Sequence, residues 1–499
     1  MATTKIASWV VTCGFIPKHP SLLMFARRTG IATRLSRTCL SGTWQCTQAV
    51  RSGVKREAVI SKSPGNIRSL ATRASYHREP HPFVRPRNLL AISLGFGAAT
   101  ILFMYLNDTR AGVYRWFAMP MVHALLDPEE SHKLAIWLAK HGLVPKERTK
   151  DDDVLHTEIW GKTLSNPIGL AAGFDKNAEA VDALFDFGFG LVEIGSVTPL
   201  PQPGNPKPRM FRLPADTAVI NRYGFNSDGH RAVEDRFKAR IRNYLHHNRH
   251  VLGLQPTEGL AYPVTLPETS RKSLREAKML GVNLGKNKLS STESNEDYVR
   301  GVKDLGAYAD YLVVNISSPN TPGLRALQRR EPIEKLMQEV KAARDDSLPH
   351  RPPLLVKIAP DLSDQEIEDI AAVVKNVGVD GVVISNTTVS RPGSLKSGPK
   401  VSTETGGLSG PPVHPLSLAV VRKFYALTNG TIPIIGCGGV KSADEVLAFA
   451  KAGASLVQLY TAMAYEGPGL VAEIKEEVAR KLKTEGKRWQ EIVGADHRK

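Results

Sequence analysis

The sequence predicts an α/β protein built on a (β/α)8 TIM barrel, preceded by a transit peptide, one transmembrane helix and a small two-helix cap. Three observations lead to this prediction. Eight short apolar segments alternate with helical stretches, polar or glycine-rich residues follow most of these segments, and a basic N-terminal region precedes an uncharged apolar run. Buried parallel strands have continuous apolar sequences, and eight of them with intervening helices close a barrel. A doubly wound open sheet is the alternative. The eight segments are Ile168–Ala172, Leu191–Ser196, Val282–Leu284, Tyr311–Asn315, Leu354–Ile358, Gly381–Asn386, Ile432–Gly436 and Leu456–Leu459.

The positive charge of the chain is concentrated at its N-terminus. The formal net charge is +17, and residues 1–88 contribute +13 of it, with 15 Lys or Arg and only two acidic residues. The remaining 411 residues carry 51 basic and 47 acidic groups, so we expect no nucleic-acid partner. An arginine-rich, acid-poor segment is typical of a mitochondrial transit peptide, and a disordered basic tail is the alternative. We interpret residues 1–88 as a transit peptide and basic linker.

Residues 89–106 contain no charged side chain. Eighteen helical residues span about 27 Å, close to the roughly 30 Å hydrocarbon core of a bilayer. A buried core helix is the weaker alternative because the segment has no polar face. We therefore predict a single-pass anchor in the mitochondrial inner membrane. The strongly basic side of this segment should stay in the matrix, so the rest of the chain should face the intermembrane space.

Residues 110–145 are expected to form a cap of two helices. The first, Gly112–Leu126, has apolar residues at helical spacing, and Pro120 is expected to break or kink it. The second, Pro128–His141, follows the N-cap residue Asp127 and ends at Gly142. Two interpretations stay open: helices packed on a larger domain, or an apolar cap beside the membrane that admits a lipid-soluble ligand.

The barrel domain is expected to span residues 154–499, with an insertion at about 198–280. That insertion is too long for one βα unit and should hold extra structure over the barrel mouth, such as a lid. Its part 236–278 is polar and has little periodicity, so we expect a variable loop there.

Polar residues crowd the end of the fourth strand, at residues 313–321. Asn315 and Asn320 flank a serine pair that includes Ser318. Asparagine amides can bracket a flat amide-bearing ring, and a serine between them could move a proton. A plain strand-to-helix turn is the alternative, since Ser, Pro and Asn form turns. Two asparagines around a serine pair favour a site.

Other strand ends predict a phosphate-bearing planar cofactor. Lys357 lies inside an apolar run, where it needs a bound anion or a strand-end salt bridge. The seventh strand ends at Gly436 and is followed by Gly438 and Gly439, and Tyr460 and Thr461 follow the eighth strand. In (β/α)8 barrels, backbone N–H groups at these two positions commonly bind phosphate.

The residues now described resemble a known family, the class 2 dihydroorotate dehydrogenases, which are membrane-linked, quinone-reducing flavoenzymes of pyrimidine synthesis. The likeness covers roughly Arg110 to the C-terminus. The matching strings are AAGFDKN at 171–177, EIGSVTP at 193–199, FRLP at 211–214, NRYGFNS at 221–227, GVNLGKNK at 281–288, NISSPNTPGLR at 315–325, VKIAPDL at 356–362, SNTTVSRP at 385–392, TGGLSG at 405–410, GCGG at 436–439 and LVQLYTA at 456–462.

The resemblance implies a quinone dehydrogenase that oxidises (S)-dihydroorotate to orotate in UMP synthesis. Ser318 would be the base that removes the C5 proton, FMN N5 would take the C6 hydride, and ubiquinone, reached through the inner-membrane lipid, would be the final acceptor. The quinone site would include His132 and Arg212, and no metal site is expected. The resemblance implies a substrate site of Lys176, Asn221, Arg222, Tyr223, Gly224, Phe225, Asn283, Asn315, Asn320, Asn386 and Thr387. It implies an FMN site of Ala172, Gly173, Ser196, Asn283, Asn315, Lys357, Ser385, Gly410, Gly438, Gly439, Tyr460 and Thr461.

Two other functions are weighed against this one. A soluble dihydroorotate dehydrogenase with another acceptor would carry cysteine at the base position, and Ser318 together with the anchor argues against it. An inactive flavin- or quinone-binding membrane protein would have no need of the intact set of asparagines and lysines.

Overall fold

The structure is a computed structural model that describes residues 86–252, 266 and 270–498. The predicted transit peptide and most of the basic linker lie outside the described residues, as do residues 253–265 and 267–269 of the predicted variable loop.

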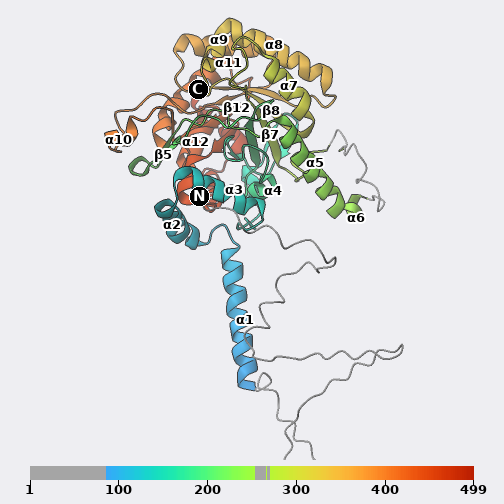
Figure 1. The fold of residues 1–499 in the computed structure, drawn as a ribbon, viewed down its shortest axis with the longest axis vertical. Helices are drawn as coiled ribbons and strands as arrows, with labels where there is room; N and C mark the ends of the chain where they lie inside the picture. Colours follow the sequence, from blue (N-terminus) through green and yellow to red (C-terminus); the bar gives the residue numbers. More distant parts are fainter. Residues whose placement is uncertain (1–85, 253–265, 267–269, 499) are drawn as a thin grey trace, which may run out of the picture. The chain divides into compact units, whose positions relative to one another are not determined.

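Eight parallel strands close into a barrel, and each pairs with the barrel strand that precedes it in the chain (Figure 1). The last strand pairs with the first in parallel, which completes the closure. The predicted barrel is confirmed and the open-sheet alternative is wrong. The strands are β3 (Ile168–Leu170), β4 (Leu191–Val197), β7 (Met279–Leu284), β8 (Tyr311–Asn315), β9 (Leu354–Ile358), β10 (Gly381–Ile384), β12 (Ile434–Cys437) and β13 (Leu456–Leu459).

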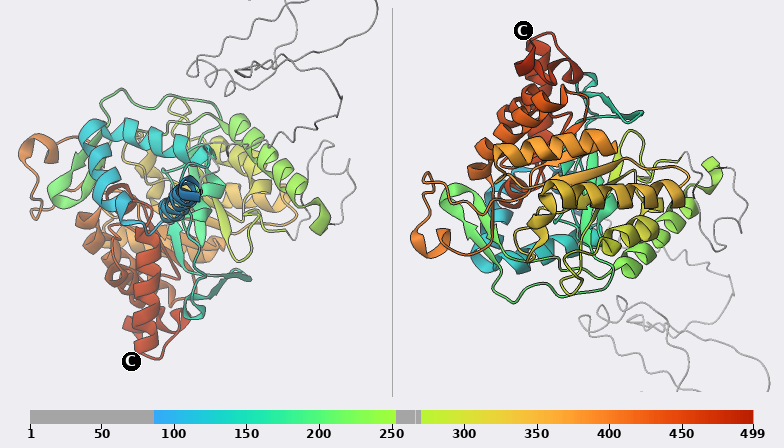
Figure 2. Two further views of the ribbon diagram at one scale, coloured as in Figure 1. Left: turned by 90° about the horizontal axis from the view of Figure 1, so that it is seen from below. Right: turned by 90° about the horizontal axis from the view of Figure 1, so that it is seen from above.

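Helices cover the outside of the barrel, and Figure 2 shows α8, α9 and α11 side by side along one flank. The main core lies between the strands and these helices. A second cluster, which includes Leu191, Tyr311 and Leu355, fills the inside of the barrel. The helices of the barrel domain are α4 (Val181–Asp186), α5 (His230–His247), α6 (Arg249–Leu252), α7 (Glu296–Leu305), α8 (Arg330–Ser347), α9 (Asp364–Val377), α10 (Pro399–Ser402), α11 (His414–Thr428), α12 (Ala443–Ala452), α13 (Thr461–Glu466), α14 (Leu470–Thr484) and α15 (Trp489–Ile492).

A short antiparallel hairpin closes the N-terminal end of the barrel. It consists of β1 (Thr157–Ile159) and β2 (Lys162–Leu164). At its turn, Trp160 packs on Tyr311 with ring centroids 5.9 Å apart and donates a hydrogen bond to the Asp380 carbonyl. This end is therefore filled by side chains, and the opposite end is left for a ligand.

A three-stranded antiparallel sheet lies at the C-terminal mouth, as expected for the insertion. It contains β5 (Met210–Leu213), β6 (Ala218–Asn221) and β11 (Gly407–Ser409), which comes from a distant part of the chain. Its members Asn221 and Ser409 line the cavity described below.

The prediction of a variable loop over 236–278 is wrong for residues 236–252. Helix α5 runs to His247, and α6 follows it. The side chains Val233, Phe237, Ile241 and Leu245 are buried at a spacing of four residues. This one-face pattern stabilises a helix although the other positions are polar.

The segment before the barrel contains α1 (Pro86–Leu106) and the cap. Within α1, Asn88–Leu106 is long and apolar enough to cross a membrane, and none of its most apolar window is buried. The cap begins with a π-helical turn, Tyr114–Ala118, and continues as α2 (Met119–Leu125) and α3 (Pro128–Lys140).

The expectation that Pro120 breaks or kinks the first cap helix is only partly met. The helical path continues through it, because Pro120 lies in the first turn of α2, where proline is tolerated. The regular helix is interrupted directly before α2, where Tyr114–Ala118 forms a π-helical turn.

Candidate functional site

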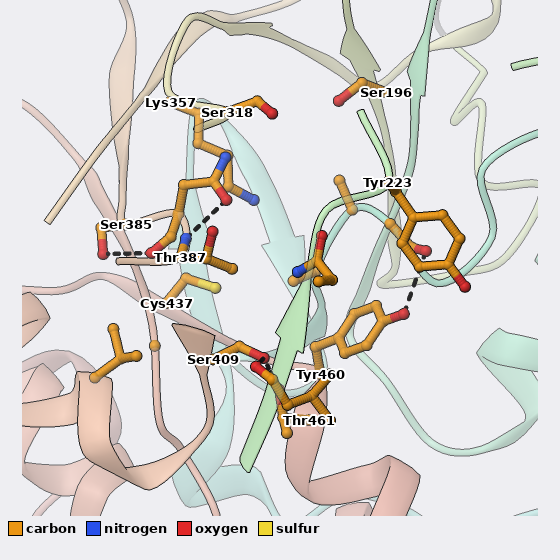
Figure 3. Close-up of a pocket in the computed structure, with 18 of the residues that line it drawn as sticks. Ser196, Tyr223, Ser318, Lys357, Ser385, Thr387, Ser409, Cys437, Tyr460 and Thr461 are labelled. Atoms are coloured by element: carbon orange, nitrogen blue, oxygen red, sulfur yellow. Dashed lines mark hydrogen bonds between the residues drawn. The ribbon is translucent and has the colours of Figure 1, made fainter. Parts of the chain in front are cut away.

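A cavity opens at the C-terminal ends of the barrel strands (Figure 3). In this view Ser318 and Lys357 lie on one side, and Tyr223 and Tyr460 lie on the other. Residues from almost every βα unit meet here although they are far apart in sequence. The predicted site residues that line it are Ala172, Gly173, Lys176, Ser196, Asn221, Tyr223, Gly224, Phe225, Asn315, Ser318, Asn320, Lys357, Ser385, Asn386, Thr387, Gly410, Gly438, Gly439, Tyr460 and Thr461.

Four predicted site residues are not among those that line the cavity. Arg222 forms an ion pair with Glu404 at 2.5 Å. Asn283 is fully buried behind the cavity wall, where it contacts wall residues. His132 and Arg212 lie at the cap and are described below.

The side-chain amide of Asn315 is fixed at the end of β8. Its Nδ2 donates to Ser196 Oγ at 2.9 Å and to Asn283 Oδ1 at 3.2 Å. Its Oδ1 accepts a hydrogen bond from Ser317 Oγ at 2.9 Å, and Ser317 Oγ in turn accepts from Asn386 Nδ2 at 3.0 Å. Two asparagines from different strands are thus held in defined orientations, which suits recognition of a planar ring with amide groups.

Ser318 lies on the cavity wall in the loop after β8. Its Oγ accepts a hydrogen bond from the backbone N–H of Asn320 at 3.3 Å. The Asn320 side chain donates to the backbone carbonyl of Asn221 at 3.1 Å, which ties this loop to the mouth sheet. Among the described residues, no carboxylate or imidazole hydrogen-bonds Ser318. Its hydroxyl therefore lies at the cavity with no hydrogen-bonded base from the described part of the chain.

Arg325 holds this loop in place, a role that the sequence analysis missed. Its Nε donates to the Ser317 carbonyl at 3.1 Å, and its terminal nitrogens donate to the Thr387 carbonyl at 2.9 Å and to Asp361 at 2.8 Å. One guanidinium therefore joins the loops after β8, β9 and β10. Arginine can do this because its donors form a rigid planar fork. Arg325 ends the string NISSPNTPGLR at 315–325, so its nearness in sequence to Ser318 could have indicated a role in this loop.

Lys176 is one of the two lysines that line the cavity. Its Nζ donates to Asn226 Oδ1 at 2.6 Å and lies 3.6 Å from the centroid of the Tyr223 ring. No carboxylate of the described residues hydrogen-bonds it, and burial together with the charge of Arg209 lowers the pKa of Lys176 to about 7. An ammonium group without an acidic partner suits an anionic ligand.

Of the two alternatives for Lys357, the salt bridge is observed and the bound anion stays a prediction. Lys357 lines the cavity, and its Nζ lies 3.8 Å from the carboxylate of Glu193, which is the strand-end salt bridge.

A glycine cradle forms another part of the wall. Gly410, Gly438 and Gly439 have φ values of +100°, +130° and +73°, which side chains rarely adopt. A Cβ added at Gly439 would lie 2.7 Å from the backbone nitrogen of His414, so no side chain fits at this position and the backbone stays bare. Such a bare backbone fits a phosphate group.

Two buried polar atoms at the cavity have no hydrogen-bond partner among the described residues. They are Thr387 Oγ1 and Gln458 Oε1. Unsatisfied buried groups are costly, so their presence on a cavity wall indicates a ligand with polar groups. The cradle and these atoms together fit a phosphate-bearing cofactor and a polar ring.

His132 connects cap helix α3 to the cavity wall. Its Nε2 is hydrogen-bonded to the Phe174 carbonyl at 2.7 Å. Its ring centroid lies 5.3 Å from that of Phe174 and 6.5 Å from that of Tyr460, which lines the cavity. Burial lowers the pKa of His132 to about 4, so the imidazole is neutral at physiological pH.

Arg212 lies half-buried between the end of α2 and the start of α3. It donates to the carbonyl of Leu126 at 2.9 Å and to Ser131 Oγ at 2.6 Å. An ion pair with Asp216 would give Arg212 a purely structural role. Asp216 instead accepts hydrogen bonds from the backbone N–H groups of Lys396 and Ser397. His123, whose carbonyl also accepts from Arg212 at 3.4 Å, lies in the same cluster and was missed in the sequence analysis.

Comparison with known proteins gives consistent matches. A family model described as dihydroorotate dehydrogenase matches residues 154–482. A protein of Schizosaccharomyces pombe named dihydroorotate dehydrogenase (quinone), mitochondrial, is 47% identical over 416 residues, which cover 83% of this chain and 92% of that protein. The Mus musculus protein of the same name is 48% identical over 412 residues, covering 82% of this chain and 97% of that protein. A crystal structure of the Eimeria tenella DHODH in complex with ferulenol is similar with a TM-score of 0.67 and 40% identity, and covers 76% of this chain and 99% of that one.

Proposed function

Because the chain belongs to the family of mitochondrial, quinone-dependent dihydroorotate dehydrogenases, which are oxidoreductases, we propose that it oxidises (S)-dihydroorotate to orotate, with FMN as hydride acceptor and ubiquinone as final acceptor. The reaction would serve de novo synthesis of UMP. The observation that supports this most directly is Ser318 on the wall of a cavity that also holds Lys176 and the glycine cradle. These groups suit a proton, a carboxylate and a phosphate, respectively.

The substrate would lie against the asparagines and Lys176. Dihydroorotate carries one carboxylate, which suits the ammonium group of Lys176, and a ring with amide groups, which suits Asn315, Asn386 and Asn320. Arg222 and Asn283 would act through their neighbours, because Arg222 pairs with Glu404 and Asn283 contacts Asn315. The other proposed substrate contacts are Asn221, Tyr223, Gly224, Phe225 and Thr387.

FMN would occupy the part of the cavity beside the glycine cradle. When bound, FMN would supply N5 as the acceptor of the hydride from C6 of the substrate. Gly410, Gly438, Gly439 and Thr461 would hold its phosphate end, and Lys357 would face its ring. The remaining proposed contacts are Ala172, Gly173, Ser196, Asn315, Ser385 and Tyr460, and Asn283 would act through Asn315.

Ser318 would remove the proton from C5 of the substrate. Asn320 fixes the position of its Oγ through the backbone N–H, and Arg325 fixes the loop. The wall formed by Asn315 and Asn386 would keep the substrate ring in a single orientation against Ser318. Such positioning contributes much of the rate of a proton transfer.

The chain's relatives are mitochondrial by name, and α1 is long and apolar enough to cross a membrane. We assign residues 1–88 as transit peptide and linker, 89–106 as an inner-membrane anchor, 110–145 as a quinone-tunnel cap and 154–499 as the FMN-binding barrel. The barrel would face the intermembrane space. Trp116, Phe117, Met121 and Leu125 on the cap are all more than 60% exposed, which suits contact with lipid and entry of a quinone.

A purified full chain should show the visible spectrum of an oxidised flavin that bleaches when dihydroorotate is added. Reoxidation by ubiquinone but not by soluble acceptors would separate this function from that of a soluble dehydrogenase. A flavin that dihydroorotate does not bleach would instead indicate an inactive flavin-binding protein.

Deletion of residues 1–107 should give a soluble protein that still reduces its flavin with dihydroorotate. The lining of the cavity begins only at Ala171, and no residue of α1 contributes to it. Flavin content and the rate of bleaching, compared with the full chain in detergent, test this. A truncated protein that folds without FMN would show that the anchor does more than tether.

The affinity for orotate should fall as the pH rises above about 7. The pKa of Lys176 is lowered to about 7 in the free protein, so above that pH the lysine must take up a proton before it pairs with the carboxylate. The penalty approaches about tenfold per pH unit. Spectral titration with orotate between about pH 6 and pH 9 measures the slope. Lys176→Met should bind weakly and lose this slope, and a constant affinity in the unsubstituted protein would contradict the assignment.

A further inference from the structure

A completely buried carboxylate lies inside the barrel beneath the cavity. Glu193, on β4, has no exposed surface. Its oxygens accept hydrogen bonds from Gln458 Nε2 at 2.7 Å, Asn283 Nδ2 at 2.8 Å and the Tyr311 hydroxyl at 3.3 Å. These donors come from three other strands, so Glu193 is the centre of a polar network inside an otherwise apolar core.

The only cation within ion-pair distance of Glu193 among the described residues is Lys357, at 3.8 Å. The Lys357 side chain is 6% exposed, and no described residue accepts a hydrogen bond from its ammonium group. A buried charge without a partner is strongly unfavourable. Glu193 therefore holds a cation at the cavity wall while leaving its hydrogen-bond donors available.

The other partners of Glu193 also reach the cavity. Asn283 Oδ1 accepts a hydrogen bond from Asn315, whose amide lines the wall. Gln458 lines the cavity, and because its Nε2 donates to Glu193, its buried Oε1 is left without a partner as an acceptor. A single carboxylate thus orients one ammonium group and two amides.

We propose that Glu193 is a positioning residue that holds Lys357 against the bound cofactor and, by offsetting its positive charge, lowers the reduction potential of FMN. This inference rests on the proposed FMN site. Reduced flavin carries more negative charge than oxidised flavin, so a nearby cation favours the reduced form. The negative charge of Glu193 opposes this preference, and in a buried site with low polarity the effect of one charge is large.

The test is the midpoint potential of FMN bound to the full chain in detergent, measured by reductive titration against a reference dye. This titration uses neither dihydroorotate nor quinone. Glu193→Gln should shift the potential to a more positive value. The equilibrium constant for reduction of the flavin should increase by about tenfold or more. Lys357→Gln should shift it in the opposite direction. The double variant should lie between the two, because both charges are removed together.

Tyr311→Phe is the matched control, because it removes one hydrogen bond to Glu193 but no charge. Its potential should stay at that of the unsubstituted protein. The inference is overturned if Glu193→Gln leaves the potential unchanged, or if Tyr311→Phe shifts it equally.

A second comparison covers the case in which Glu193→Gln does not fold. The double variant leaves no unpaired charge, and its potential must then be more positive than that of Lys357→Gln alone. An equal or lower potential overturns the inference. A full chain that binds no FMN overturns the proposed function as well, whereas bound FMN with an unshifted potential overturns only this inference.

Discussion

Ser318→Ala should retain FMN and slow the reduction of the flavin by dihydroorotate by about 10²- to 10⁴-fold, as expected for loss of a positioned base. The hydroxyl lies on the cavity wall, and its loss removes a single hydrogen bond, from the backbone N–H of Asn320. Stopped-flow measurement of flavin bleaching gives the rate directly. A normal rate in this variant would end the assignment of Ser318 as the base.

The neighbouring serine provides a matched control for this prediction. Ser317→Ala removes a fully buried hydroxyl that bonds to Asn315 and Asn386. Its main effect should be weaker substrate binding through less well-oriented amides, with a much smaller effect on the rate at saturating dihydroorotate. Similar losses of rate in both variants would mean that the loop as a whole, and not the Ser318 hydroxyl, is responsible.

The rate of flavin reduction should also rise with pH. A serine hydroxyl is a poor base, and no described carboxylate or imidazole hydrogen-bonds Ser318 to assist it. Deprotonation is therefore favoured by lower proton activity. A flat pH profile would argue against direct proton removal by Ser318.

Arg212→Ala should impair reoxidation of the flavin by quinone by about 10- to 100-fold, the effect of losing a charge-assisted hydrogen bond, while flavin reduction stays nearly intact. Arg212 lies at the end of the apolar cap, half-buried, and does not line the substrate cavity. A quinone that reaches this point along the apolar cap would find a donor for its oxygen. Stopped-flow measurement of the two half-reactions separates the effects.

The structural alternative for Arg212 is that it merely caps helix α2, since it donates to the carbonyls of His123 and Leu126. Arg115→Ala is the control for loosening of the cap, because Arg115 joins the cap to Glu466 and Glu473 of the barrel domain. If Arg115→Ala impairs reoxidation as much as Arg212→Ala, Arg212 acts through packing. Equal damage to both half-reactions in Arg212→Ala would also remove it from the quinone site.

The barrel was predictable from the sequence for a clear physical reason. Parallel strands buried on both faces must be apolar along most of their length, as in Gly381–Ile384 and Ile434–Cys437. The residues directly after these strands lie at the C-terminal end of the barrel, whatever the length and conformation of the loops. The pairing of Asn315 and Asn320 around Ser318 therefore indicated a site before any contact was known.

Most of helix α5 occupies residues for which a variable loop was predicted, although their apolar residues have helical spacing. The spacing of Val233, Phe237, Ile241 and Leu245 is helical, but the surrounding charged residues obscured it. The mouth sheet carried no comparable signal, since β11 has three residues and pairs with β6 from a distant part of the chain. Such short strands are stabilised by their partners rather than by their own sequence.

The sequence by itself determined the barrel, the apolar segment before it and the residue types at the strand ends, because burial and backbone geometry restrict these locally. Only the tertiary structure decided which side chains meet. Glu193 pairs with Lys357 across the barrel, and Arg325 joins three loops. These contacts link residues far apart in the chain, and their energies depend on distance and burial, which no local sequence pattern encodes.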